Sequence, residues 1–541
     1  MLLFPSRDRA PTPDPKDAAE AAPVHPPTRQ TLTTKAQHHE VIVVGGGPAG
    51  CAAATLLARR SHKVALIRPT IPTAASLAES VPPSASRILE ELGFAEAVER
   101  GGFHPNRGNS VWWANQELRE ERFPEDQAGY HTDRAGLESV LIEAANQAGV
   151  RVYEGTTART AQETDEGWVL RCEVEGEAEV ELAAPWVIDA TGRHGFLARK
   201  EGREPDRSTT TLALVRRWRQ PTGWEGDDGF STLIESYSDG WAWSVPMNEH
   251  VRCFTAMVDQ RSSDLSGAGV GSMLDAELAK TTHMGPMLSG AVPEGDAWAC
   301  PASLYTASLF ARPGLLLAGD AGSFIDPLSS FGVKKALSSG WLAGVAVHTA
   351  LIDDSMTETA TSFFDARERE VYRSYRRTSA QFFEAAHAAH GGRYWSDRAA
   401  AARRAGGDDP ATHRLLSGAQ DPDRITPEVP EADVRHAFGT IKELETLSSR
   451  AGSSLRTFER PGIDGQRIVL QDHLGSDTYP EGMRYVRGVD LRHLVRMAPQ
   501  HSDVADGWTA YNDVAPPVSL PDYLTALATA FAARLLEHVE H

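Results

Sequence analysis

The chain has 541 residues, 41% of them hydrophobic, which is enough for a large core and two or three structural units. Its formal net charge of −20 repels phosphates and anionic lipids, so we expect neither nucleic acid nor a membrane surface as a partner. No apolar run reaches about 18 residues, the opening residues do not resemble a signal peptide, and the cysteines show no CxxC pair. These features predict a cytoplasmic globular protein.

The first 37 residues are rich in proline, alanine, threonine and charged residues. Such a composition cannot bury enough apolar surface to offset the entropy that is lost when the chain is ordered. We therefore predict that residues 1–37 form a disordered tail.

A strand, a glycine-rich turn, a helix and a second strand follow in "EVIVVGGGPAGCAAATLLARRSHKVALIRP". The β-branched run Val41–Val44 leads into Gly45, Gly47 and Gly50, which have the GxGxxG spacing, and Val64–Ile67 is the second strand. In this context the glycines allow backbone N–H groups and a helix N-terminus to contact a pyrophosphate. The stretch therefore predicts a dinucleotide-binding site.

The second strand ends in Arg68, at the place where dinucleotide-binding folds usually carry an acidic residue for the ribose hydroxyls. Ribose recognition must therefore differ in this chain. The Arg68 side chain is expected to be either a solvated charge or a contact for a phosphate.

Two later stretches predict further parts of the same site. Pro185–Gly195 is a strand that ends in a turn of small residues, and Gly314–Gly344 is a strand, a turn and a long helix. In the second stretch the Asp320 carboxylate can hold a ribityl hydroxyl, and backbone N–H groups around Gly332 and Val333 begin the helix. A helix start that points at a flavin ring would stabilise negative charge on the ring.

Together and in this order, the three motifs closely resemble the glutathione-reductase-type FAD fold of the aromatic hydroxylases and the flavin-dependent halogenases. The resemblance covers residues 38 to about 400 and implies FAD as the cofactor. It implies an α/β fold in which a Rossmann-like FAD-binding domain is interleaved with an antiparallel β-sheet substrate domain. The FAD-binding segments are 38–104, 130–200 and 300–345, the substrate-domain segments are 105–129 and 201–299, and a helical region follows at 346–405.

Three shorter matches narrow the family. The stretch "LAESVPP" is similar to the GESxPP segment of halogenase-like flavoproteins, with Ala78 in place of the glycine. Arg134 resembles an arginine that begins a helix near the cofactor, although an ion pair at the helix start also explains it. The stretch "GWAWSVP" matches the WxWxIP signature of flavin-dependent halogenases. The cofactor-binding residues that the resemblance implies are Gly45, Gly47, Gly50, Glu79, Ser80, Arg134, Gly319, Asp320, Pro327, Gly332 and Val333.

Four tryptophans are candidates for the wall of a substrate pocket. Trp241 and Trp243 are two positions apart, which places them on the same face of a strand, and Pro246 ends the pairing of that strand. Trp112 and Trp113 could complete the wall. Ordinary core packing is an equally good explanation for all four side chains. No catalytic residue is assigned.

The residues that handle the oxidant in flavin-dependent halogenases are missing. In that family the flavin forms a C4a-hydroperoxide, and a lysine then holds the halogenating species beside the substrate; the corresponding residues 104–124 contain no lysine. Ser329 stands where tryptophan halogenases carry a glutamate. The stretch "DPLSSFGVKKALSSG" instead resembles flavoproteins of tryptophylquinone cofactor biogenesis, which hydroxylate a tryptophan of a partner polypeptide. The resemblance favours an FAD-dependent monooxygenase that hydroxylates an electron-rich aromatic ring through the hydroperoxide.

The expected substrate is an aromatic small molecule or a tryptophan in a peptide or protein. Electrons are expected from a separate flavin reductase or from transiently docked NAD(P)H, because no second GxGxxG motif occurs. Three alternatives stay open: a flavin-dependent halogenase, an FAD-dependent isoprenoid reductase, and a flavin-bound protein that binds a partner without catalysis.

Four further basic side chains are assigned no part in the chemistry. His387 and His390 have no third metal ligand nearby in the sequence, so we expect no metal. Lys334 and Lys335 follow the cofactor turn and are expected to face solvent or a phosphate.

A polar, proline-rich linker at residues 406–431 separates the C-terminal unit, residues 432–541. In this unit we expect a helix at 431–452, strands at 466–474 and 483–498, and a final helix at 520–541. This order suggests a small winged-helix-like unit. Because the acidic chain disfavours DNA, we expect it to act as a cap or to dock a partner.

Overall fold

The computed structural model describes residues 36–70, 77–115, 117–124, 127, 129–224, 226–261, 269–329, 331–406, 429–444, 446–480 and 482–539. The predicted tail up to residue 35 and the predicted linker from 407 to 428 lie outside these ranges. Gln37, which we assigned to the tail, instead belongs to β1 (Gln37–His38), and β1 pairs in parallel with β12 (Val180–Ala184). An extended segment can pair in this way whatever its composition, because backbone groups make the bonds.

A six-stranded sheet joins segments that are far apart in the sequence. Its strands, in spatial order, are β21 (Ala311–Arg312), β22 (Leu315–Leu317), β13 (Trp186–Asp189), β2 (Val41–Val44), β3 (Val64–Ile67) and β9 (Arg151–Tyr153). Pairing is parallel from β22 to β9, and the four strands from β22 to β3 are buried along their whole length. Such burial is typical of parallel strands that helices cover on both faces.

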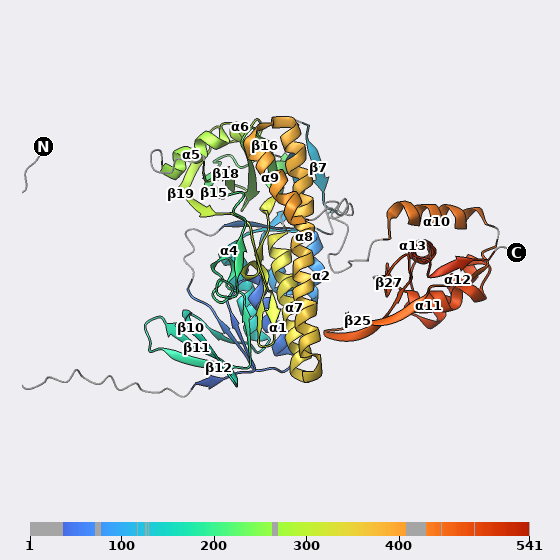
Figure 1. Ribbon diagram of the computed structural model, residues 1–541. Helices are drawn as coiled ribbons and strands as arrows, with labels where there is room; N and C mark the ends of the chain where they lie inside the picture. Colours follow the sequence, from blue (N-terminus) through green and yellow to red (C-terminus); the bar gives the residue numbers. More distant parts are fainter. Residues whose placement is uncertain are drawn as a thin grey trace, which may run out of the picture. The chain divides into compact units, whose positions relative to one another are not determined.

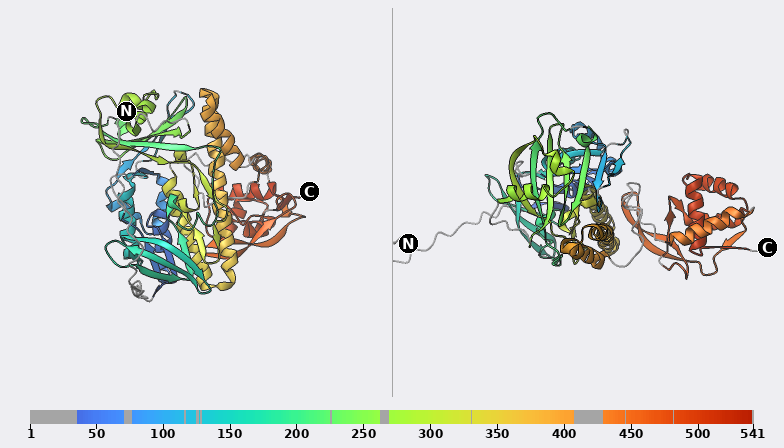
Figure 2. Two further views of the ribbon diagram at one scale, coloured as in Figure 1. Left: turned by 60° about the vertical axis from the view of Figure 1, so that its left-hand side comes forward. Right: turned by 90° about the horizontal axis from the view of Figure 1, so that it is seen from above.

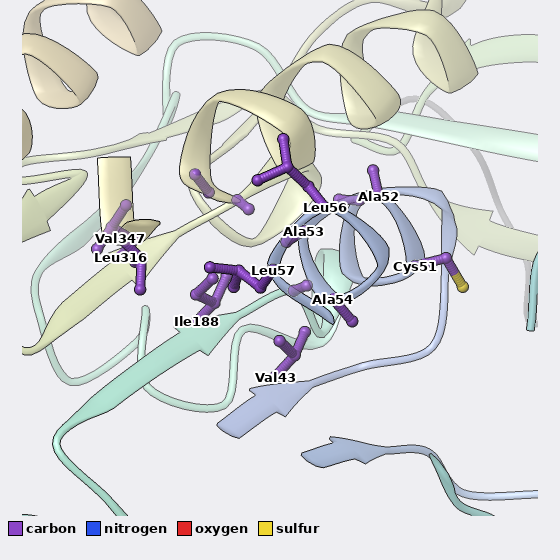
Figure 3. Close-up of a cluster of buried hydrophobic side chains, with 14 of the residues drawn as sticks. Val43, Cys51, Ala52, Ala53, Ala54, Leu56, Leu57, Ile188, Leu316 and Val347 are labelled. Atoms are coloured by element: carbon purple, nitrogen blue, oxygen red, sulfur yellow. The ribbon is translucent and has the colours of Figure 1, made fainter. Parts of the chain in front are cut away.

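Two helices follow the predicted cofactor turns and pack against each other: α1 (Pro48–Arg59) and α7 (Gly332–Ile352). They approach closely because a Cβ at Gly340 of α7 would clash with the backbone carbonyl of Ala49 in α1. Figure 3 shows the buried side chains of α1, among which Leu56 points toward α7. The alanine and glycine content of both helices therefore fixes the distance between them.

The second large sheet has seven strands and is antiparallel except where β16 meets β6. Its strands, in spatial order, are β19 (Val292–Pro301), β15 (Thr211–Arg219), β18 (Val251–Asp259), β17 (Gly240–Pro246), β16 (Ser231–Tyr237), β6 (Gly108–Trp112) and β7 (Arg119–Arg122). The antiparallel sheet of the predicted fold class is thus present.

Side chains alternate between two faces of this sheet. The outer face packs on α5 (Gly269–Leu278) and α6 (Met284–Met287), and the inner face packs on α8 (Thr357–His390) and α9 (Gly392–Gly406). The inner face is defined by Ala213, Val215, Ile234, Trp241, Val245, Cys253 and Met257. In Figure 1 the long helix α8 runs past both large sheets, and Figure 2 shows it from two other directions.

Smaller elements complete this part of the chain. Two short sheets are β4 (Ala78–Val81), β8 (Gly129–Asp133) and β5 (His104–Asn106), and β14 (Arg203–Pro205), β20 (Tyr305–Ala307) and β23 (Ser323–Phe324). A third contains β1, β12, β11 (Gly167–Val174) and β10 (Thr156–Thr164). The remaining helices are α2 (Ser86–Glu91), α3 (Ala95–Arg100) and α4 (Arg134–Gln147). No described helix is long and apolar enough to cross a membrane.

The C-terminal unit has a hydrophobic core of its own. Its elements are α10 (Glu431–Glu443), β24 (Ser449–Ala451), β25 (Arg456–Asp464), β26 (Arg467–Gly475), β27 (Tyr485–Val486), β28 (Val489–Asp490), α11 (Leu491–Met497), α12 (Val504–Val514), α13 (Leu520–Ala532) and β29 (Leu536–His538). The first predicted helix is shorter than expected, and the winged-helix likeness stays a prediction.

Two expectations for this unit were wrong. The predicted strand at 483–498 contains helix α11, because Asp490 caps its N-terminus and its apolar residues recur at helical spacing. The predicted final helix ends at Ala532, and β29 then pairs with β24. This strand pairing replaces the last turns of the expected helix.

The hairpin of β25 and β26 contacts the first part of the chain. Ile468 of β26 is buried in the core cluster around α1 and α7, and its backbone N–H donates to Oγ1 of Thr349 at 2.9 Å. The C-terminal unit is therefore joined to helix α7 by contacts as well as by the chain.

Candidate functional site

The GxGxxG turn is built by close backbone contacts. Gly45 has a φ of +115°, and a Cβ there would clash with the Ala190 carbonyl oxygen. A Cβ at Gly50 would clash with the Gly45 carbonyl oxygen, so these two glycines allow strand β2 and helix α1 to meet. Gly47 is the N-cap of α1 and makes no side-chain cap, which leaves the first N–H groups of the helix available to an anion.

Arg134 lies beside this turn. A Cβ at Gly47 would be 3.3 Å from both Nη2 of Arg134 and Oε1 of Glu138. The guanidinium pairs with Oε1 of Glu79 at 2.9 Å and with Oε1 of Glu138 at 2.6 Å. Burial raises the pKa of the Glu79 carboxyl, and the nearby Arg134 opposes that rise. The helix-start ion pair and the position next to the phosphate turn are therefore both features of Arg134.

Ser80 connects the GES-like strand to the seven-stranded sheet. Its Oγ accepts hydrogen bonds from Nδ2 of Asn106 at 2.9 Å and from Oγ1 of Thr232 at 3.0 Å. Asn106 is buried and belongs to the segment in which halogenases were expected to carry a lysine. In this structure Ser80 therefore ties two sheets together.

Arg68 is not a solvated charge. Its side chain is 13% exposed, and its Nε lies 3.3 Å from Oε1 of Glu154. Its aliphatic stem covers Gly46, where an added Cβ would be 2.9 Å from Cδ of Arg68. Arg68 thus packs against the glycine-rich turn at Gly46, and its ion pair with Glu154 holds it there.

The turn predicted to hold the ribityl chain lies between α1 and α7. Gly319 has a φ of +62°, and a Cβ there would be 2.9 Å from Cβ of Ala49 in α1. Its N–H donates to Oγ of Ser339 in α7 at 2.7 Å. The Tyr305 hydroxyl donates to the backbone oxygen of Asp320 at 2.7 Å, while the Asp320 side chain stays 26% exposed. These contacts hold the carboxylate at the surface of the site.

Lys335 does not face solvent, which was one of the two expected environments. Its side chain is 2% exposed, and Nζ lies 3.3 Å from the Gly319 oxygen, 3.5 Å from Oδ1 of Asp320 and 2.5 Å from the Ser323 oxygen. Lys334 is also buried, with Nζ 5.7 Å from the centre of the Phe331 ring. The helical period of α7 turns both side chains into the protein, and the oxygen atoms of the turn compensate the Lys335 charge.

Helix α7 begins without a side-chain cap. Phe331 is its N-cap, and a Cβ at Gly332 would meet no atom within 4 Å, so open space lies in front of the helix start. Val333 is buried behind it. Pro327 lies just upstream, after Asp326, whose Oδ1 accepts from the Leu328 N–H at 3.1 Å. The side chain of Ser329 lies outside the described residues. The start of α7 can therefore face a flavin ring.

The structure separates the four predicted tryptophans. Trp241 and Trp243 share the inner face with Trp113, and the Trp113 and Trp241 rings lie 6.0 Å apart. Trp112 lies on the outer face, where it stacks on His283 at 4.4 Å. Trp112 therefore cannot line a pocket with the other three, because neighbouring residues of an extended strand point to opposite sides.

Trp243 differs from Trp113 in its hydrogen bonding. The Trp113 Nε1–H donates to the Phe382 oxygen at 2.8 Å, whereas the buried Nε1–H of Trp243 has no acceptor among the described residues. Other partly buried side chains that pack against the same hydrophobic cluster are Leu77, Val111, Met247, Trp298, Cys300, Phe324 and Phe382. This surface is apolar and aromatic, with one indole N–H left to donate.

The two histidines of α8 do not form a metal centre with other ligands. His390 Nε2 lies 2.9 Å from Oγ of Ser236. Over the described ranges, no three side chains of histidine, cysteine, aspartate or glutamate gather where they could hold a metal ion.

The family pattern described as FAD binding domain matches residues 38–346. The chain belongs to this FAD-binding family, and its cofactor is FAD. The residues fit that cofactor, since the starts of α1 and α7 carry no side-chain cap and the Arg134 guanidinium lies 3.3 Å from the position that a Cβ at Gly47 would take. The fold class and the cofactor predicted from the motifs are thereby confirmed.

The chain is also similar to individual flavin-dependent enzymes. Tryptophan 2-halogenase from Chondromyces crocatus is 27% identical over 352 residues, which are 61% of this chain and 65% of that protein, just under two thirds of its length. The flavin-dependent halogenase CmlS has the same fold, with a TM-score of 0.72 and 20% identity over 93% of this chain and 96% of its own. The peptidyl tryptophan dihydroxylase QhpG is similar at a TM-score of 0.61, with 20% identity over 92% and 99%. The solved structures show that the chain has the same fold as these flavoproteins.

Sequence reasoning missed the side chains that support the cofactor turn. Tyr305 lies in a strand that precedes the turn, and Ser339 and Lys335 lie in the helix that follows it. One signal was available: Lys335 and Ser339 are four residues apart, so they share a face of α7. The side on which that face lies depends on the packing of α7 against α1.

Proposed function

We propose that this chain is a flavin-dependent enzyme of the halogenase type that modifies an electron-rich aromatic ring, with halogenation as the first candidate reaction. The supporting observation is the apolar and aromatic inner face. Strand β17, which has the WxWxIP-like sequence, contributes Trp241 and Trp243 to this face. The halogenases among the relatives support the same reaction. The substrate is an indole or a phenol, free or held in a peptide.

The residues of this chain would each make a physical contribution. FAD, when reduced and supplied with oxygen, provides the oxidising equivalent. The apolar side chains of the inner face exclude water from the reacting groups. The start of α7 stabilises negative charge on the ring system, and Arg134 with the start of α1 holds the pyrophosphate.

Hydroxylation is the second candidate, and specific residues favour it. Residues 104–124 contain no lysine to hold a halogenating species, and Asn106 in that segment is used in a hydrogen bond to Ser80. The "DPLSSFGVKKALSSG" stretch supports the same reaction through its resemblance to tryptophan-hydroxylating flavoproteins. In this case the substrate would be a tryptophan of a partner polypeptide, and the product would gain one oxygen.

The proposal includes an outside source of electrons. A separate flavin reductase or transiently docked NAD(P)H would reduce the FAD, because a single GxGxxG motif serves the FAD itself. An isoprenoid reductase or a flavin-bound protein without catalysis would not consume oxygen in step with an aromatic substrate. Oxygen uptake that depends on the aromatic substrate therefore separates the proposal from both.

The deciding experiment supplies the reduced enzyme with oxygen and with tryptophan, a tryptophan-containing peptide or a phenol, with and without bromide. Mass spectrometry of the products distinguishes the reactions: a brominated product supports halogenation, and a gain of about 16 mass units, unchanged by bromide, supports hydroxylation. The control is Gly47→Val, which we expect to lack FAD. If neither product forms and none of the three substrates changes the rate of oxygen uptake, the proposal is wrong.

A further inference from the structure

Helix α7 holds both backbone polar groups of Gly319. The Gly319 N–H donates to Oγ of Ser339 at 2.7 Å, and the Gly319 carbonyl accepts from Nζ of Lys335 at 3.3 Å. The same ammonium lies 2.5 Å from the Ser323 oxygen, farther along the turn. One face of α7 therefore fixes the turn that carries Asp320.

Lys335 also brings a full positive charge close to the expected position of the flavin. It lies three residues after Gly332, the open start of α7, and its Nζ is 3.5 Å from Oδ1 of Asp320. The charge is shielded from water, since the Lys335 side chain is 2% exposed. A charge in such surroundings acts over a longer distance than a solvated one because the local dielectric constant is lower.

A buried carboxyl group lies behind this lysine. Glu368 of α8 is 3% exposed and accepts a hydrogen bond from Ser339, while its Oε2 has no hydrogen-bond partner among the described residues. Burial raises the pKa of Glu368 to about 7, and the Lys335 ammonium opposes that rise. Gly319, Ser339 and Glu368 thus form a continuous chain of hydrogen bonds from the turn to α8.

We propose that Lys335 and Glu368 set the reduction potential of the bound FAD, Lys335 raising it and Glu368 lowering it when ionised. A two-electron-reduced flavin carries negative charge near neutral pH, so a positive charge nearby favours reduction and a negative one opposes it. Ser339 holds the turn without a charge, and it is therefore a positioning residue. The inference concerns the cofactor alone and applies equally to halogenation and hydroxylation.

The test is an anaerobic redox titration of the holoenzyme at pH 8 against a reference dye, without substrate. We expect Lys335→Met to lower the ratio of reduced to oxidised FAD about tenfold at a fixed dye potential, which is about 30 mV for a two-electron couple. Lys335→Arg should keep the wild-type potential. Ser339→Ala should weaken FAD retention because it removes the bond to the Gly319 N–H, but it should not lower the potential of the bound FAD, because it removes no positive charge.

Glu368→Gln provides the opposite change with nearly the same side-chain shape. At pH 8 it should raise the FAD potential, because it removes a negative charge behind the turn. The matched control is Glu370→Gln, since Glu370 lies on the same helix but pairs with Arg377 at 2.7 Å. An unchanged potential in Lys335→Met, or equal shifts in Lys335→Met and Ser339→Ala, would overturn the proposal. Because no substrate is used, these results do not depend on which aromatic reaction the enzyme performs.

Discussion

The starts of α1 and α7 are both uncapped, but they are supported in different ways. At α1 the support is steric, since any residue other than glycine at position 45 or 50 would clash with backbone atoms. At α7 the support is electrostatic, since Lys335 and Ser339 bind the neighbouring turn through its polar groups. The first support tolerates no added atom, whereas the second depends on charge and on protonation. The two helix starts are therefore expected to respond differently to mutation and to pH.

The largest effect is expected at α1. Gly47→Val should abolish FAD retention, because its side chain would enter the space of the pyrophosphate. The apoprotein should still fold, since a Cβ at this position meets only the ends of two side chains, Arg134 and Glu138, at 3.3 Å. FAD absorbance after gel filtration and far-UV circular dichroism would measure both effects. A folded Gly47→Val protein with stoichiometric FAD would show that the site is misplaced.

The α7 side should depend on pH through Glu368. Its pKa is raised from 4.5 to about 7 in the folded chain, so the folded state keeps a proton that the unfolded state has lost. The associated stability is complete below about pH 4.5 and is lost as pH rises through 7. Wild type should therefore lose stability relative to Glu368→Gln between pH 5 and pH 8, by on the order of 3 kcal/mol at most.

Urea unfolding of the two proteins at both pH values measures this difference. Other groups titrate equally in wild type and variant, so the comparison isolates Glu368. A constant difference between the two proteins would contradict the expected protonation of the buried carboxyl.

A smaller effect is expected from Ser339→Ala. The variant leaves the Gly319 N–H without its acceptor, and a lost buried hydrogen bond costs about 1–3 kcal/mol. The unfolding free energy should fall by that amount at pH 5, where Glu368 is protonated, and by more at pH 8, because Glu368 also loses the hydrogen bond that favours its ionised form. Urea denaturation of the apoprotein at both pH values would check it; an unchanged unfolding free energy at pH 5 would contradict the bond to the Gly319 N–H.

The smallest effect is expected on the inner face. Trp243→Phe removes an Nε1–H that has no acceptor among the described residues, so it should cost less stability than a variant of the same size change that breaks a hydrogen bond. The matched variant Trp113→Phe removes the hydrogen bond to the Phe382 oxygen and should cost about 1 kcal/mol. Urea denaturation compares the two. Equal losses would mean that the Trp243 N–H has a partner in solution.

The steric support was predictable from the sequence, and the electrostatic support was not. The spacing of Gly45, Gly47 and Gly50 after a β-branched run has few structural solutions, so strand, turn and helix followed directly. A lysine side chain can point to solvent or into the protein, and the local sequence does not decide between the two. Lys335 is buried because the packing of α7 on α1 selects its direction. Long-range packing of this kind leaves no local pattern.

The same distinction explains the outcome for the aromatic residues. Period-two alternation correctly put Trp241 and Trp243 on one face, because that rule is local to a strand. It also places Trp112 and Trp113 on opposite faces, a consequence that we did not apply to them. In the C-terminal unit, α11 was missed because its helical spacing spans only seven residues, too few for the pattern to stand out.

The order of strands in the six-stranded sheet has a consequence for synthesis of the chain. β2 pairs with β13, which pairs with β22, so the centre of the sheet is complete only after residue 317 has left the ribosome. The hairpin that places Ile468 against α7 emerges about 150 residues later still. Until residue 317 is made, the apolar strand β13 lacks its partner β22, and such exposed strand edges bind chaperones or aggregate. Expression yield should therefore respond to chaperone supply and translation rate as well as to FAD.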